Sequence, residues 1–129
     1  MTKTKLSLEG LTFQATKINE AKNVLTITLN RPEKKNALNN VMMNEICYAL
    51  AYAKQERSIR VVVIAAEGDI FCAGADLRRE ESESNVPKLE GSDDISLMLR
   101  HLYKPVICKI QGSVSVSYTH LTLPTNDVV

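Results

Sequence analysis

The fold is decided by the stretch Val61-Val-Val-Ile-Ala-Ala-Glu-Gly-Asp-Ile-Phe-Cys-Ala-Gly74, which is followed by Ala75-Asp76-Leu77. A β-branched apolar run stops at Glu67-Gly68-Asp69, and a short apolar stretch then leads into a turn of small residues. Small side chains at a turn before a helix leave backbone N–H groups bare, and a helix start adds further unpaired donors. Such a turn can stabilise an oxygen atom that acquires negative charge. The alternative is a plain helix start whose small residues allow close packing.

The segments around this stretch predict an α/β fold. Alternating apolar residues predict strands at 11–16 and 24–29, joined by a hairpin turn at 20–23. The continuous apolar run from Ile59 to Ala65 predicts a strand that is buried on both faces. Strand, helix and strand in succession imply a right-handed crossover connection.

A helix is predicted between these strands. Asn39 or Asn40 can cap its start, and the helical pattern runs to about Glu56. Its apolar face is expected to consist of Met42, Ile46, Ala49, Leu50 and Ala53.

A polar segment at 80–94 predicts a loop. We expect its acidic side chains to be solvated and not to bind a metal, namely those of Glu80, Glu81 and Glu83. A second helix is predicted at 95–102, capped by Ser92 or Asp93 and ended before Pro105. A further strand follows at 106–111.

Three blocks occur in a fixed order along the chain. They are Leu29-Asn-Arg-Pro-Glu-Lys-Lys-Asn-Ala-Leu38, Ile70-Phe-Cys-Ala-Gly-Ala-Asp-Leu77 and Lys104-Pro-Val-Ile-Cys-Lys-Ile-Gln-Gly112. Together they resemble the crotonase family, the enoyl-CoA hydratase/isomerase superfamily. One block alone is a weak signal, whereas the ordered set is specific and covers roughly residues 10–115.

The resemblance implies a fold and an activity. The fold would be the N-terminal portion of a crotonase-like ββα spiral with two roughly perpendicular sheets. The substrate would carry coenzyme A, and the carbonyl of its acyl-CoA thioester would pass through an enolate stabilised by an oxyanion hole. The expected reaction of the parent enzyme is hydration of a trans-2-enoyl-CoA in fatty-acid β-oxidation, with double-bond isomerisation or thioester hydrolysis as alternatives. No covalently bound cofactor and no metal are expected.

The resemblance also assigns roles to individual residues. The backbone N–H of Ala75 would be the first oxyanion donor, and the backbone around Ala73, Asp76 and Leu77 would meet either the adenine end or the thioester arm of coenzyme A. Ala37 would pass beside the pantetheine. Coenzyme A carries a 3′-phosphate and a pyrophosphate, which basic side chains on a loop can meet. The candidates are Arg31, Lys34 and Lys35.

The end of the chain does not resemble the family. The second oxyanion donor would fall at Ser117, next to bulky residues that do not replace a glycine turn, and the first acid–base glutamate at His120. We expect a partial domain at 1–115 and a non-family tail at 116–129 that is artefactual or disordered; a natural divergent tail is the alternative. The chain is therefore expected to be truncated and catalytically inactive.

Composition indicates a single globular domain and gives no support for a nucleic-acid-binding or membrane-spanning protein. The 129 residues, 44% of them apolar, suit one globular domain, and a net charge of +1 gives no case for nucleic-acid binding. The sequence shows no signal peptide and no apolar stretch that spans a membrane. Cys47, Cys72 and Cys108 lack metal-ligand spacing, which indicates buried reduced thiols in a cytoplasmic protein. By the resemblance, the parent would be a homotrimer or hexamer, and this fragment is not expected to assemble.

Two other classes stay open. The chain could be a non-enzymatic module that binds coenzyme A or a partner chain. An unrelated flavodoxin-like α/β domain would need a phosphate-binding glycine loop after its first strand, which the sequence lacks.

Overall fold

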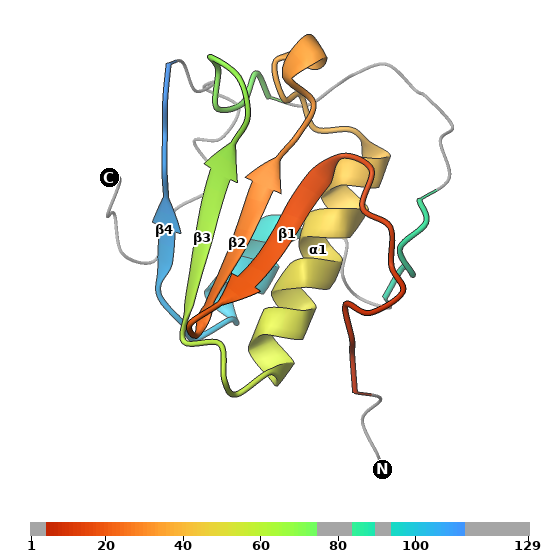
Figure 1. The fold of residues 1–129 in the computed structure, drawn as a ribbon, viewed down its shortest axis with the longest axis vertical. Coiled ribbons are helices and arrows are strands. Elements are labelled where there is room, and N and C mark those ends of the chain that lie inside the picture. The colour runs from red at the N-terminus through yellow and green to blue at the C-terminus, as the bar shows by residue number, and fades with distance from the viewer. Residues whose placement is uncertain (1–4, 75–83, 90–93, 113–129) are drawn as a thin grey trace.

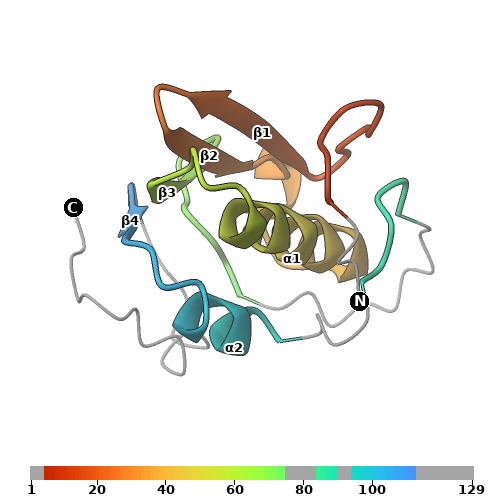
Figure 2. The same ribbon diagram turned by 90° about the horizontal axis from the view of Figure 1, so that it is seen from below.

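The computed structural model describes residues 5–74, 84–89 and 94–112. Four strands form one sheet in the order β1-β2-β3-β4; β1 is antiparallel to β2, and the other neighbours are parallel. The strands are β1 (Thr16–Ala21), β2 (Val24–Leu29), β3 (Val61–Ala66) and β4 (Val106–Cys108). Helix α1 (Asn40–Gln55) connects β2 to β3, and α2 (Ile95–Arg100) precedes β4. Both helices lie on the same side of the sheet (Figure 1, Figure 2), so the expected α/β fold is confirmed.

The first two strands form a tight hairpin. Lys22 and Asn23 occupy its turn with φ of 50° and 69°, and this pair of left-handed conformations matches the twist of the strands. The strand expected at 24–29 is confirmed. The strand expected at 11–16 is wrong, because the first strand begins only at Thr16.

A buried carboxylate explains why the segment before β1 is not a strand. Glu45 of α1 is 0% exposed, and its two oxygens accept hydrogen bonds from the amides of Gln14 and Ala15, at 2.7 and 3.0 Å. The Thr16 hydroxyl donates to the same group at 2.8 Å. These donors are therefore taken up by a helix side chain, and the segment is tied to α1.

Helix α1 forms because its cap and its apolar spacing agree. Asn39 is the N-cap, since its side-chain oxygen accepts from the Met42 amide at 2.9 Å. All five residues expected on the apolar face are buried. They pack on alternate strand residues in one core, which includes Leu25, Ile27, Leu29 and Val62. Burial of one such leucine contributes roughly 1.5–3 kcal/mol, so this layer is the main source of stability.

Strand β3 packs against the described core with one face, on which Val62 is buried and Ile64 and Ala66 are partly buried. Val62, opposite Leu25 on β2, is buried, whereas Val61, Val63 and Ala65 are only partly buried. Both described helices lie on the Val62 side (Figure 2). Burial on both faces was therefore a wrong expectation for the described part of the chain, because an apolar run does not reveal which segment covers its second face.

The last two elements are shorter than expected. Asp94 caps α2, since its side chain accepts from the Leu97 amide at 3.2 Å, so neither of the two residues expected as its cap takes this role. Helix α2 ends at Arg100 and β4 ends at Cys108, whereas the sequence predicted ends at 102 and 111. The loop expected at 80–94 is described at 84–89 and at residue 94, where no helix or strand occurs, and residues 113–129 lie outside the described part.

Lys104 ties the start of β4 to the end of α1. Its ammonium group donates to the carbonyls of Ala53 and Glu56, the latter at 2.8 Å, where the last turn of a helix leaves carbonyls unpaired. Partial burial lowers the pKa of Lys104 from its ordinary value. The contact fixes the second crossover against the first.

All three cysteines are buried thiols, as expected. Burial raises the pKa of the Cys108 thiol, which keeps it protonated and weakly reactive at neutral pH. Neither of the described helices is long and apolar enough to cross a bilayer.

Candidate functional site

The three blocks recognised in the sequence meet at one end of the sheet, where β2, β3 and β4 finish. Strands β2, β3 and β4 run parallel, so the segments after their carboxyl ends lie beside one another (Figure 1). In open α/β sheets ligands bind outside these carboxyl ends. We refer to this region as the junction and define it as loop 31–38, turn 66–74 and residues 111–112.

Loop 31–38 is a compact structure in its own right. It begins with the 3-10 helix η1 (Pro32–Lys34), and Lys35 and Asn36 then adopt left-handed conformations with φ of 53° and 56°. Asparagine tolerates such a conformation better than most residues. The reversal turns the chain back toward the sheet before α1 begins.

The basic side chains of this loop differ in exposure. Arg31 is buried, and its guanidinium donates to the Ala37 carbonyl at 2.5 Å, so it supports the loop from inside. Lys34 is half-buried and Lys35 is exposed. The lysines are therefore better placed than Arg31 to meet an anion in solution.

Asn36 connects this loop to the turn after β3. Its side chain is 0% exposed, and its amide nitrogen donates to the carbonyls of Glu67 and Ile70, both at 2.8 Å. Its side-chain oxygen accepts from the Arg31 amide at 2.8 Å. The Cys72 thiol donates to the Asn36 carbonyl at 3.0 Å. One residue thus joins two segments that are distant in sequence.

Backbone hydrogen bonds continue this contact. The Ala73 amide donates to the Lys35 carbonyl at 2.9 Å, and the Leu38 amide donates to the Gly74 carbonyl at 2.8 Å. The loop and the small-residue segment therefore lie side by side up to Gly74. The amide of Ala73 is engaged in this pairing.

Gln111, which follows β4, also binds the turn after β3. Its side-chain nitrogen donates to the carbonyls of Ala66 and Gly68, at 2.7 and 2.9 Å. Its own carbonyl accepts from the Phe71 amide at 3.1 Å. The third block is thereby joined to the second.

Gly112 allows the closest approach in the junction. Its φ is 65°, and a Cβ atom at this position would overlap the carbonyl oxygen of Asp69. Only glycine fits both the left-handed backbone and the contact. The backbone after β4 therefore lies directly against the turn.

The structure brings some of the expected site residues together. Ala37 is half-buried and Ala73 is exposed, and both stand in the facing segments 31–38 and 72–74, with Lys34 and Lys35 on the first of them. Other expected residues lie outside the described part of the chain, namely Ala75, Asp76, Leu77, Ser117 and His120. The role of Ala75 as an oxyanion donor stays a prediction.

Sequence reasoning assigned no role to Asn36, Gln111 or Gly112. All three residues belong to the recognised blocks. The available signal was the residue type, because an amide side chain beside a turn can donate to bare carbonyls, and a glycine after it permits close approach. Spacing alone does not reveal which carbonyls accept.

The charges at the junction are mixed and mostly exposed. Glu67 and Asp69 of the turn are exposed, and Glu67 forms a solvent-exposed ion pair with Lys17 at 3.3 Å. Such a pair contributes little to stability. Within the described ranges, no group of three or more His, Cys, Asp or Glu side chains is placed to hold a metal ion.

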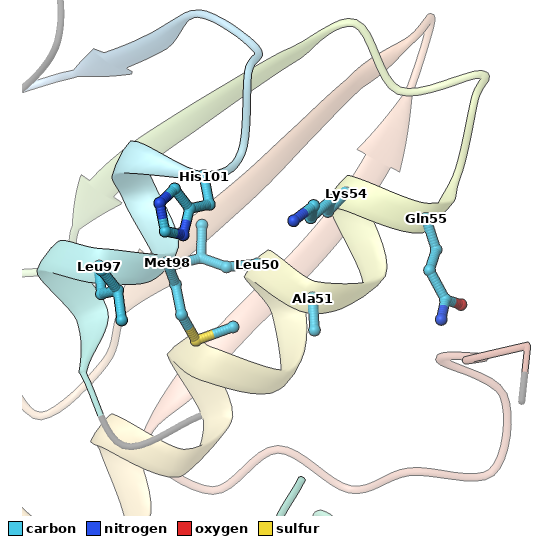
Figure 3. A pocket seen from close by; sticks show the side chains of 7 residues that line it. All are labelled: Leu50, Ala51, Lys54, Gln55, Leu97, Met98 and His101. Carbon is cyan, nitrogen blue, oxygen red and sulfur yellow. The ribbon is translucent and has the colours of Figure 1, made fainter. Parts of the chain in front are cut away.

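A hollow of about 630 Å³ lies elsewhere, between α1 and α2 (Figure 3). Its lining is formed by Leu50, Ala51, Lys54, Gln55, Leu97, Met98 and His101. The C-terminal half of α1 leads into the start of β3, so this hollow lies toward the end of the sheet opposite the junction (Figure 1). We therefore treat it as separate from the candidate site.

Comparison with known proteins gives a consistent result. A family model described as enoyl-CoA hydratase/isomerase matches residues 19–126. A probable enoyl-CoA hydratase of Mycobacterium leprae is 40% identical over 98 residues, covering 74% of this chain and 39% of the relative. A 1,2-epoxyphenylacetyl-CoA isomerase of Escherichia coli is 29% identical over 119 residues, covering 84% of this chain and 44% of the relative.

Solved structures agree with the sequence comparison. The crystal structure of an enoyl-CoA hydratase/isomerase from Mycobacterium paratuberculosis matches with a TM-score of 0.64 at 29% identity, over 78% of this chain and 42% of that one. The chain thus spans less than half the length of these relatives. The family match continues past residue 115, and the domain boundary expected there stays a prediction.

Proposed function

Because the chain belongs to the enoyl-CoA hydratase/isomerase family, we propose that its junction forms part of a binding site for an acyl-CoA or enoyl-CoA thioester. The expected crotonase-type fold is confirmed by the match to solved enoyl-CoA hydratases. One observation carries the proposal. Loop 31–38 and segment 72–74, to which the resemblance assigns coenzyme A binding, are hydrogen-bonded to each other through Ala73–Lys35 and Leu38–Gly74.

The junction suits the chemistry of coenzyme A. The half-buried Lys34 and the exposed Lys35 would attract its phosphates as point charges, and Arg31 would hold their loop in shape. Ala37 and Ala73 are small, so an extended pantetheine arm would pass close to the backbone. The amide of Ala75 would then donate to the thioester oxygen, and a donor of this kind typically contributes about 10²–10³ in rate.

For the parent enzyme we propose hydration of a trans-2-enoyl-CoA. That reaction needs a second oxyanion donor and two carboxylates that handle the protons of water. Position 120 carries histidine where the resemblance expects the first glutamate, so we propose that these 129 residues bind without turnover. Isomerisation is the second candidate reaction, because two of the relatives are named isomerases. Assembly of the parent into trimers or hexamers is part of the same proposal.

Calorimetry and an enzymatic assay test this function together. We expect butyryl-CoA to bind the chain and crotonyl-CoA to show no loss of enoyl absorbance. The double variant Lys34→Gln/Lys35→Gln should weaken binding by about tenfold. Added salt should weaken binding by the wild type, because it screens the attraction between the lysines and the phosphates. Lys54→Gln, on the exposed surface of α1, is the matched control and should leave binding unchanged. Absence of binding would refute the site, and hydratase turnover would refute the inertness.

A third ligand separates the enzyme fragment from a non-enzymatic module. A module that recognises coenzyme A alone should bind free coenzyme A as tightly as butyryl-CoA. A site with an oxyanion donor should prefer the thioester, because only the thioester supplies the carbonyl oxygen that the donor meets.

A further inference from the structure

The turn after β3 is held by two side-chain amides. A turn leaves backbone carbonyls without strand partners, and a buried or partly buried carbonyl needs a donor. The Asn36 and Gln111 side-chain nitrogens supply these donors, at 2.7–2.9 Å. The accepting carbonyls are those of Ala66, Glu67, Gly68 and Ile70.

The two amides reach the turn from opposite sides. Asn36 follows β2 and Gln111 follows β4, and these strands flank β3 on its two sides in the sheet. Gly112 adds a direct backbone contact with Asp69 on the Gln111 side. The turn is thus held between the first and third blocks of the sequence. We call the side-chain amides of Asn36 and Gln111 the clamp, and variants that remove one of them the clamp variants.

We propose that Asn36 and Gln111 are positioning residues, whose side-chain amides hold turn 66–70 from both sides and so fix the backbone of Ala73 and Gly74 at the acyl-CoA site. This inference rests on the proposed function only for the identity of the ligand. Neither residue is expected to touch the reacting atoms. They act through the segment that leads directly into position 75.

The hydrogen bonds explain why both residues are amides. Each nitrogen donates to two carbonyls at once, which a carboxylate cannot do. Asn36 also accepts from the Arg31 amide, so it needs a donor and an acceptor in one buried side chain. The backbone carbonyl of Gln111 also accepts from the Phe71 amide, so the segments that follow β3 and β4 are joined here. Loss of either amide removes a part-buried hydrogen bond to the turn, at Glu67 and Ile70 for Asn36 and at Ala66 for Gln111.

The test variants are Asn36→Gly and Gln111→Ala. Glycine retains the left-handed backbone at position 36 without strain and removes only the side chain. Asn36→Asp is a second variant, which keeps the acceptor and replaces the donor by a charge facing two carbonyls. Asn39→Ala is the matched control, because it removes another asparagine with a structural hydrogen bond, the N-cap of α1.

Amide hydrogen exchange gives the first measurement and needs no ligand. Removal of either clamp amide should speed exchange at Phe71 and Ala73 by about tenfold or more relative to Asn39→Ala. Exchange in β2 should serve as the internal reference for global stability. Equal exchange at Phe71 and Ala73 in the clamp variants and the control would overturn the proposal, whether or not the chain binds acyl-CoA.

The second measurement uses butyryl-CoA labelled with carbon-13 at the thioester carbonyl. In wild type and in Asn39→Ala, binding should move the carbonyl resonance downfield, because a donor polarises the bond. In the clamp variants the bound resonance should return toward that of the free thioester. A full downfield shift in both clamp variants would overturn the proposal. If wild type does not bind, the proposed function fails, and the exchange result alone decides the clamp.

Discussion

The layer that α1 forms on the sheet and the junction beyond the sheet edge are stabilised in different ways. In the layer, apolar side chains such as Leu25 and Met42 are removed from water, and any well-fitting apolar group serves. In the junction, named donors meet named carbonyls, as Asn36 and Gln111 do, and the residue type is strictly constrained. The first region holds the fold together, and the second fixes the position of backbone beside the proposed site.

This difference predicts which mutations should change global stability and which should change local geometry. A cavity in the apolar layer should lower the free energy of unfolding of the whole chain. A lost donor in the junction should change local geometry more than global stability, because it removes hydrogen bonds and leaves the apolar side chains of the layer in place. The following experiments test that division, beginning with the largest expected effect.

Leu25→Ala tests whether the apolar layer contributes most of the free energy of unfolding. The side chain is fully buried under α1, so its loss leaves a cavity and should lower the free energy of unfolding by about 3 kcal/mol. Urea unfolding measures this change. Thr28→Ala, on the less covered face of β2, should cost under about 1 kcal/mol. Similar losses in the two variants would show that the two faces of β2 contribute alike.

Glu45→Gln sharpens the comparison, because Glu45 is a polar group inside the apolar layer. Glutamine keeps one acceptor oxygen but turns an NH₂ group toward donors of the segment before β1. We expect the free energy of unfolding to fall by roughly 2 kcal/mol. The exposed Glu9→Gln should change it by less than about 0.5 kcal/mol. A neutral Glu45→Gln would mean that the carboxylate does not anchor this segment.

Gly112→Ala probes the junction against a matched glycine. Gly112 and Gly10 both have positive φ, of 65° and 75°, but only at Gly112 would a Cβ atom overlap a neighbouring carbonyl. The alanine at 112 should cost about 2 kcal/mol, roughly 1 kcal/mol more than at Gly10. Thermal or urea unfolding measures both. Equal costs would indicate that the close approach is not required.

The smallest effect concerns pH at the edge of the apolar layer. The Tyr52 hydroxyl donates to Glu20 at 2.5 Å, and this bond, with burial and nearby carboxylates, raises the pKa of Tyr52 to about 12. The folded state therefore keeps this proton where the unfolded state has lost it. Stability contributed by Tyr52 is present below about pH 10 and is lost as the pH rises toward about 12. Urea unfolding across this range should show a shallower decline for Tyr52→Phe than for wild type, and identical declines would exclude the linkage.

Much of the apolar layer was predictable from the sequence. The strand at 24–29, the cap at Asn39 and the buried face of α1 follow from local patterns, which the structure repeats with small shifts. The failure at 11–16 has a tertiary cause, because Glu45 takes up amides that alternation assigns to a strand. The failure at β3 is of the same kind, since the covering of its second face depends on other segments.

The candidate site divides in the same way. The resemblance of the three blocks located the junction and named Ala37, Ala73, Lys34 and Lys35 within it. It did not assign the clamp, because the partners of Asn36 lie 31 and 34 residues away and those of Gln111 lie 45 and 43 residues away. Long-range hydrogen bonds of this kind leave no periodic signal.

The sequence by itself determined the class of fold and the family, because apolar spacing and motif order are properties of neighbouring residues. Only the tertiary structure decided which carbonyls the two amides satisfy, why glycine is required at 112 and why Arg31 points inward. These depend on parallel strands that carry distant segments to one edge of the sheet, where directional bonds of 2.5–2.9 Å select individual atoms.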